Sequence, residues 1–285
     1  MASTKDIARS VPERPSWFIS PSDITGRSIQ PIGRGGLGEV FTGTYFGSKV
    51  AIKQLLGTCN IDQLNEYRHR IDLWKQLSHP NILSLLGACD QDDDGNPIPP
   101  FMVSPFMPNG TLLDHVANNN VPLEEKLRLL HQVAAGIAYL HDHNVVHGGL
   151  KAANVLLDSG ANAVVSDFGL SRIKHTSTLT DRSRNSSYGA PETLDDDELG
   201  DTTMKTDVYA FAITTYEVLN DAKPVWITDD GEALQDQAIE QTVDHGQRPQ
   251  QIDGIPNDIW TLIERCWAQT PADRPTFEQI AAALD

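Results

Sequence analysis

The stretch Val145–Leu157, VVHGGLKAANVLL, decides how this chain is interpreted. Both ends are apolar, which favours a buried strand end, a polar loop and a second buried strand. The loop brings His147, Lys151 and Asn154 into one short turn, with Gly149 between the histidine and the lysine. Polar side chains gathered in a loop between buried segments form a candidate site, and the rest of the chain identifies its chemistry.

The composition limits the classes of protein to which the chain can belong. Its 285 residues suffice for one large domain, or for two lobes with a cleft between them. A formal net charge of −17 and a pI near 4.8 argue against nucleic acid or an anionic membrane as a partner, because both bind basic surfaces.

Cysteine usage and the first residues bear on the compartment. Cys59, Cys89 and Cys266 are scattered with no CxxC spacing, which predicts neither a zinc site nor a disulfide framework and indicates a reducing environment. The start, MASTKDIARS, lacks the apolar core of a signal peptide, and no later stretch reaches the roughly 18 apolar residues of a membrane helix. We therefore expect a cytoplasmic protein that binds no membrane.

Residues 1–28 differ in character from the remainder. Prolines among serines and charged residues predict an extended N-terminal arm, followed by one domain over residues 29–285. The apolar group Trp17–Ile19 is the exception within the arm. We expect it to anchor the arm to the body of the domain.

A glycine-rich hairpin opens the domain. Strand-like segments over residues 28–33 and 39–46 flank the form G-x-G-x-x-G-x-V, made by Gly33, Gly35, Gly38 and Val40. Glycines let a backbone approach phosphate groups closely. A Rossmann fold would need a helix after the third glycine, so a hairpin that covers phosphates is the better interpretation.

Helical and strand-like segments then follow in turn. Apolar spacing of three and four residues predicts helices over residues 62–77 and 123–141, and apolar runs predict strands over residues 83–88, 101–103, 155–157 and 163–165. Two more motifs lie at strand ends. They are VAIK at Val50–Lys53 and the triplet DFG at Asp167–Gly169.

These motifs together resemble those of protein kinases. His147–Asn154 is similar to the catalytic-loop pattern H-R-D-L-x-x-x-N, and the glycine loop, VAIK and DFG match further kinase motifs in the same order. HPNI at 79–82, APE at 190–192 and CWAQTPADRP at 266–275 extend the resemblance over about residues 29–284. The amino-acid sequence of these motifs is most similar to that of the tyrosine-kinase-like group, and Lys151 is typical of the serine/threonine kinases in that group.

The resemblance implies a fold. It is an α+β, bilobal architecture with a five-stranded antiparallel sheet and one helix in the small lobe, over residues 29–104. A hinge over residues 104–108 leads to a large, mostly helical lobe over residues 109–285. In the large lobe, Arg274 is expected to pair with Glu192.

The resemblance also implies ATP and Mg²⁺ as ligands. Asn154 and Asp167 would supply oxygen ligands to the metal, while Ser104 would be a small gatekeeper behind the adenine. Pro105 has no N–H, but the family uses only the carbonyl there, and the N–H of Met107 would meet the adenine. The expected nucleotide-binding residues are Gly33, Gly35, Gly38, Val40, Ala51, Lys53, Ser104, Pro105 and Met107.

Three positions depart from the kinase pattern. Gly149 stands where the family has the aspartate that accepts the substrate proton, and Gly148 replaces the arginine that binds a phosphate on the activation segment. Arg70 stands where a helix glutamate pairs with Lys53 in the family. Glu66, one turn earlier on the same helix face, is a candidate replacement if the helix shifts by a turn.

The segment over residues 170–189 would be the activation segment. It is dense in hydroxyl side chains, which are candidate phosphorylation sites and are equally typical of a flexible loop. Asn185 stands where the family often has a threonine that contacts the catalytic aspartate.

The departures lead to three functional hypotheses. The first is a pseudokinase that binds ATP with Mg²⁺, has little or no transfer activity and acts on a protein partner such as an active kinase. The second is a working serine/threonine kinase in which Gly149 replaces the catalytic aspartate. The third is a scaffold that binds no nucleotide at all.

Overall fold

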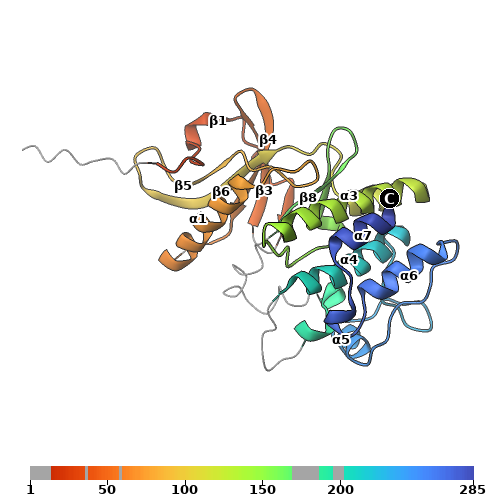
Figure 1. Ribbon diagram of the computed structural model, residues 1–285. Coiled ribbons are helices and arrows are strands. Elements are labelled where there is room, and N and C mark those ends of the chain that lie inside the picture. Colours follow the sequence, from red (N-terminus) through yellow and green to blue (C-terminus); the bar gives the residue numbers. More distant parts are fainter. Residues whose placement is uncertain (1–13, 36–37, 58–59, 169–185, 195–201) are drawn as a thin grey trace, which may run out of the picture.

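The computed structural model describes residues 14–35, 38–57, 60–168, 186–194 and 202–285. The chain forms two lobes, one built on an antiparallel sheet with helix α1 beside it and one that is mostly helical and carries the C-terminus (Figure 1). The predicted α+β, bilobal kinase fold is confirmed. Within the described ranges, no helix is both long and apolar enough to cross a membrane.

The sheet of the small lobe runs in the order β1-β3-β4-β6-β5, and β2 also pairs with β3. Its register places Val40 opposite Lys53 and Ala51 opposite Ser104. Residues expected at the nucleotide site are therefore neighbours across three adjacent strands. The strands span Ile24–Thr25 (β1), Gly33–Gly35 (β2), Gly38–Tyr45 (β3), Ser48–Leu55 (β4), Gly87–Gln91 (β5) and Pro97–Pro105 (β6).

The start of the sheet is less regular than the sequence predicts. Over residues 28–33, strand geometry begins only at Gly33, because Pro31 has no N–H to give to a ladder. The N–H groups of Ser28 and Ile32, on either side of the proline, still donate to β3 carbonyls. The sheet thus has its first strand in two short pieces, β1 and β2.

The N-terminal arm packs on the small lobe. Ile19 N–H donates to the carbonyl of Ala88 at 2.9 Å, and Ala88 N–H donates to the carbonyl of Trp17 at 2.9 Å, so the arm runs beside β5. The Trp17 side chain is 2% exposed, and its indole N–H donates to Asp72 of α1 at 2.7 Å. The arm therefore contacts both the sheet and the helix.

Helix α1, Ile61–Gln76, begins with a reciprocal cap. The Asn60 side chain accepts from Gln63 N–H while the Gln63 side chain accepts from Asn60 N–H, which satisfies two donors at the helix start. Tyr67 and Ile71 are buried on the inner face of the helix. They share a core with Trp17 and residues of β4 to β6, which ties the helix to the sheet.

The large lobe is organised around α4, which is buried along nearly its whole length. A second core forms where α3, α4, α6 and α7 pack together beneath the β7–β8 hairpin (Figure 1). Thr203 and Thr276 cap α4 and α7. The elements are α2 (Leu112–Asn118), α3 (Leu123–Asp142), β7 (Val155–Leu157), β8 (Ala163–Val165), α4 (Met204–Leu219), α5 (Asp236–Asp244), α6 (Asn257–Cys266) and α7 (Phe277–Leu284).

The predicted pair of Arg274 and Glu192 is confirmed. The Arg274 side chain is fully buried and donates to both Glu192 carboxylate oxygens, at 2.6 and 2.8 Å. Several other predictions fall outside the described residues: Gly169, Cys59, Asn185 and most of the hydroxyl-rich activation segment.

Candidate nucleotide-binding and catalytic site

The centre of the site is an ion pair between the two lobes. Lys53, near the end of β4, donates from Nζ to Oδ1 of Asp167, which follows β8, at 2.5 Å. The two side chains are 17% and 34% exposed, so the pair is accessible to a ligand. The structure thus brings together the lysine expected to meet phosphates and the carboxylate expected to meet the metal.

Helix α1 presents a different pair. Arg70 Nη2 donates to Glu66 Oε1 at 2.7 Å, one helical turn away. Glu66 therefore serves Arg70, and Lys53 is paired with Asp167 instead of with an acid from α1. The replacement that the sequence left open for Glu66 is not made in this structure.

An aromatic contact joins α1 to the segment that carries Asp167. The rings of Trp74 and Phe168 meet edge-on, with centroids 5.2 Å apart. The Trp74 indole N–H also donates to the Leu83 carbonyl at 2.6 Å. Since Phe168 directly follows Asp167, this contact sets the distance from α1 to the ion pair.

One buried carboxylate binds the backbone of the loop that contains Gly149. Asp207, near the start of α4, is 1% exposed and accepts from the backbone N–H groups of His147 and Gly148, at 2.7 and 2.8 Å. It also lies 2.9 Å from His141 Nε2. The loop keeps a fixed backbone although it lacks the acid at residue 149.

Asn154 closes the same loop. Its Nδ2 donates to the Gly149 carbonyl at 2.7 Å, and its own carbonyl accepts from the N–H and the hydroxyl of Ser166. Because the amide nitrogen is used in this way, Oδ1 remains available to a cation near Asp167. Lys151 precedes the short turn Ala152–Asn154 in extended conformation.

Gly149 leaves open space where the catalytic acid would be. A Cβ added at this residue would meet no atom of the described residues within 4 Å, apart from the adjoining ones. Asp142, the nearest acid upstream in sequence, ends α3 with an exposed side chain. In the described part of the chain, no neighbouring side chain fills the place of an acid at residue 149.

The hinge keeps the features expected of an adenine site. Ser104 is 8% exposed at the end of β6, and Pro105 lies opposite Val50. Met107 N–H has no hydrogen-bond partner in the part of the chain that the structure describes, so a ligand acceptor can take it. In the glycine loop, a Cβ at Gly38 would lie 2.1 Å from the Gln54 carbonyl oxygen, which requires glycine there for packing as well.

A metal ion would be bound by few protein groups here. The described residues contain no cluster of three or more His, Cys, Asp or Glu that could hold a metal ion. Asp167 and Asn154 nevertheless fit Mg²⁺, which usually takes one or two protein oxygens and completes its shell with water and substrate phosphates. When bound, Mg²⁺ neutralises charge on the phosphates.

Sequence reasoning missed one polar pair beside the loop. Tyr188 donates its hydroxyl to Glu217 Oε1 at 2.6 Å. Burial is the main reason that the pKa values of both groups are raised, and the charge of Glu217 adds to the shift of the Tyr188 pKa. The signal in the sequence was an acid within the otherwise apolar and neutral end of the buried helix α4.

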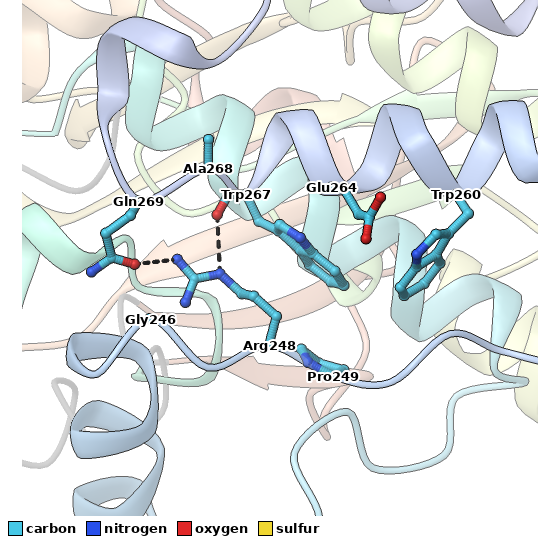
Figure 2. A pocket seen from close by; sticks show the side chains of 8 residues that line it. All are labelled: Gly246, Arg248, Pro249, Trp260, Glu264, Trp267, Ala268 and Gln269. Atoms are coloured by element: carbon cyan, nitrogen blue, oxygen red, sulfur yellow. Dashed lines mark hydrogen bonds between the residues drawn. The ribbon is translucent and has the colours of Figure 1, made fainter.

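A separate surface pocket of about 260 Å³ lies in the large lobe between α6 and the segment after α5 (Figure 2). Its guanidinium group, from Arg248, already donates to the Trp267 carbonyl at 3.0 Å and to Gln269 Oε1 at 2.7 Å. None of the sequence-predicted site residues lines it. The lining residues are Gly246, Arg248, Pro249, Trp260, Glu264, Trp267, Ala268 and Gln269.

Comparison with known proteins agrees with this geometry. The family model for protein tyrosine and serine/threonine kinases matches residues 27–284. The chain is 30% identical over 279 residues to the probable serine/threonine-protein kinase drkD of Dictyostelium discoideum, covering 96% of this chain and 20% of the relative. It is 33% identical over 260 residues to the probable serine/threonine-protein kinase SIS8 of Arabidopsis thaliana, covering 89% and 24%.

A tyrosine kinase is similar at nearly the same level. The chain is 29% identical over 287 residues to the tyrosine-protein kinase Abl of Drosophila melanogaster, covering 96% of this chain and 16% of the relative. The chain thus spans about a quarter or less of the length of these three relatives.

Proposed function

The chain belongs to the protein kinase superfamily, and from this premise we propose that it is a pseudokinase, which binds ATP with Mg²⁺ but transfers little or no phosphate. The observation that carries the proposal is Gly149. In a kinase, the residue at that position orients the substrate hydroxyl and accepts its proton, and loss of a general base typically slows a reaction about 10²- to 10⁴-fold. Among residues 14–35, 38–57, 60–168, 186–194 and 202–285, none places a side chain beside Gly149 as a substitute.

Nucleotide binding is supported by the groups that remain. Lys53 would meet the phosphates, the Met107 N–H would meet the adenine, and Asp167 with Asn154 would hold Mg²⁺. The Lys53–Asp167 pair at 2.5 Å and the preserved hinge favour this role. Arg70 argues further against catalysis, because it removes the acid that would position Lys53 in an active kinase.

The second candidate is a working serine/threonine kinase. It is favoured by the ordered catalytic loop, in which Asp207 and Asn154 hold the backbone around Gly149. The third candidate is a scaffold without nucleotide, which the preserved Lys53–Asp167 pair disfavours. We assign the chain to the tyrosine-kinase-like group because the sequences of its motifs are most similar to those of that group.

A pseudokinase acts through protein partners, so we infer a role as a signalling scaffold or an allosteric regulator of an active kinase. We place this role in the cytoplasm. The acidic charge of −17 disfavours nucleic acid and membrane surfaces as partners. We place the arm at residues 1–28 and the domain at residues 29–285, with the lobes meeting at residues 104–108.

Two measurements test this function. Saturating ATP with Mg²⁺ should raise the melting temperature of the wild-type protein, because a ligand at about 100 times its Kd adds roughly 2.7 kcal/mol to the stability. The Lys53→Met and Asp167→Asn variants should lose most of that rise. No rise in the wild type would favour the scaffold.

Phosphate transfer is measured on the wild type and on Gly149→Asp, whose new side chain has room. Both should stay far below the roughly 1–100 s⁻¹ of protein kinases. Strong recovery in Gly149→Asp would favour the second candidate, and ordinary kinase rates in the wild type would contradict the proposal outright.

A further inference from the structure

Arg70 has a buried donor without an acceptor. Its side chain is 15% exposed, and Nη2 is engaged by Glu66. Nη1 is buried and has no hydrogen-bond partner among the described residues. An unmatched donor on a buried charged group is destabilising, so a group that binds there gains more than it would at an exposed arginine.

The position of Arg70 indicates where that group would come from. Trp74 lies one helical turn after Arg70, and residues four apart lie on the same face of a helix. The Trp74 ring contacts Phe168, the neighbour of Asp167. Arg70 therefore shares the inner face of α1 with Tyr67, Ile71 and Trp74, and on that face Trp74 meets the segment that carries Asp167.

The charges of this region balance, which makes it more favourable to an anion than a site with glutamate at residue 70 would be. Lys53 and Arg70 are each matched by one carboxylate, from Asp167 and Glu66. A glutamate at residue 70 would lower the local charge by two units, so the arginine makes the site less attractive to a cation and more attractive to phosphate. Arginine also presents paired donors whose planar geometry matches phosphate oxygens.

We propose that Arg70 is a phosphate-binding residue, which donates from its guanidinium group to the phosphates of the bound nucleotide beside Lys53. ATP then binds without a divalent cation as well as with Mg²⁺, because the second positive charge takes over part of the role of the metal. The proposal rests on the nucleotide binding inferred above and adds a charge specificity to the same site.

The test is a calorimetric titration of ATP and of adenosine, in EDTA and in Mg²⁺. Wild-type protein should bind ATP in EDTA, and Arg70→Gln should bind it about tenfold more weakly or worse, as expected for a lost hydrogen bond to a charged group. Adenosine, which has no phosphate, should bind both proteins equally. Lys75→Gln removes one exposed positive charge from the same helix and should leave the ATP affinity unchanged.

A second variant should change the ATP affinity in the opposite direction. Glu66→Gln removes the competing carboxylate and leaves Arg70 in place, so ATP should bind several-fold more tightly in EDTA. Loss of a negative charge favours an anion in any case. Glu66→Gln is therefore also made in the Arg70→Lys background, where the gain should be smaller because the paired donors of arginine are absent. If Arg70→Gln fails to fold, Glu66→Gln and Arg70→Lys, which keeps the charge but loses the paired donors, still decide the matter.

The outcomes separate the two proposals. ATP binding that needs Mg²⁺, or equal affinity of wild type and Arg70→Gln in EDTA, overturns the role of Arg70 and leaves the nucleotide site intact. No ATP binding under either condition overturns both. A phosphorylated hydroxyl of the chain itself offers the same chemistry, so the titrations use phosphatase-treated protein. If Arg70→Gln then matches wild type for ATP but destabilises only the untreated, phosphorylated protein, the arginine binds that phosphate and the nucleotide assignment is wrong.

Discussion

A single residue, His147, is expected to make the folding stability of the domain depend on pH. It is fully buried, and neither ring nitrogen has a hydrogen-bond partner in the described ranges. Burial lowers the pKa of His147, with partial opposition from the charges of Asp207 and Asp167. Below about pH 6.5, the unfolded chain therefore binds a proton that the native protein does not, and stability falls as the pH falls.

We expect the unfolding free energy of the wild type to decrease from pH 7 to pH 5, with a contribution from His147 of at most about 1.4 kcal/mol per pH unit. His147→Leu, of similar volume, should lose that contribution. Urea unfolding at a series of pH values measures it. His245→Leu, at an exposed position after α5, should keep the wild-type slope.

Glu217 acts in the opposite direction, which is why variants are compared with wild type. Burial raises its pKa, so the native protein takes up that proton before the unfolded chain does, and stability rises as the pH falls. The wild-type slope contains both contributions together with those of other groups, among them His79, whose pKa is also lowered by burial. A His147→Leu profile that matches wild type would contradict the assignment.

At the scale of single residues, the sequence supplied candidate site residues but not the way they pair. Motif spacing located Gly149, Arg70, Lys53 and Asp167, because a motif fixes position along the chain. The direct bond from Lys53 to Asp167 depends on where α1 lies relative to the sheet. A sequence pattern carries no such distance, so the partners emerged only from the structure.

The N-terminal arm is the element that fixes α1 from outside. Trp17 is buried against the small-lobe core and bonded to Asp72 of α1, while a Cβ at Gly87 would lie 2.5 Å from the Trp17 carbonyl oxygen. The absence of a side chain at Gly87 thus allows the arm to lie close beside β5. Arm, strand and helix form one packed unit.

Two substitutions test this packing, one in the N-terminal arm and one in β5. Trp17→Ala should cost about 3–5 kcal/mol as a large buried side chain, and Gly87→Ala about 1–3 kcal/mol as overpacking. Because both act on one contact, the double variant should cost less than the sum, with a coupling above about 0.5 kcal/mol. Denaturant unfolding measures each value, and strict additivity would show that the arm and β5 are independent.

Element boundaries followed the sequence where periodicity was strong. The helices around residues 62–77 and 123–141 and the strands 155–157 and 163–165 were predicted within a residue or two of α1, α3, β7 and β8. The predicted strand 83–88 begins only at Gly87. Before it, Leu83 and Leu86 donate to Val165 and Val103, so tertiary contacts replace the regular ladder that apolar composition predicted.

Across the whole molecule, the large lobe holds its helical core together with a buried ion pair far from Gly149 in sequence. Arg274 donates to the Ala268 and Lys205 carbonyls as well as to Glu192, and its guanidinium lies 5.2 Å from the Tyr209 ring centroid. The described part of the large lobe thus keeps the packing of a kinase fold around a loop that has Gly149 at the position of the expected acid. This combination is expected if the fold is retained for binding.

The stability of that scaffold should depend on Arg274 far more than on surface charge. Arg274→Ala leaves Glu192 and three backbone carbonyls without their donor, and breaking a buried pair typically costs about 3–5 kcal/mol. Arg34→Ala breaks the ion pair with Glu39, in which the arginine is 72% exposed, and should cost less than about 1 kcal/mol. Denaturant unfolding compares the two under identical conditions. Small losses of similar size in both variants would mean that the large lobe does not rely on the buried pair. Its apolar core alone would then stabilise the fold.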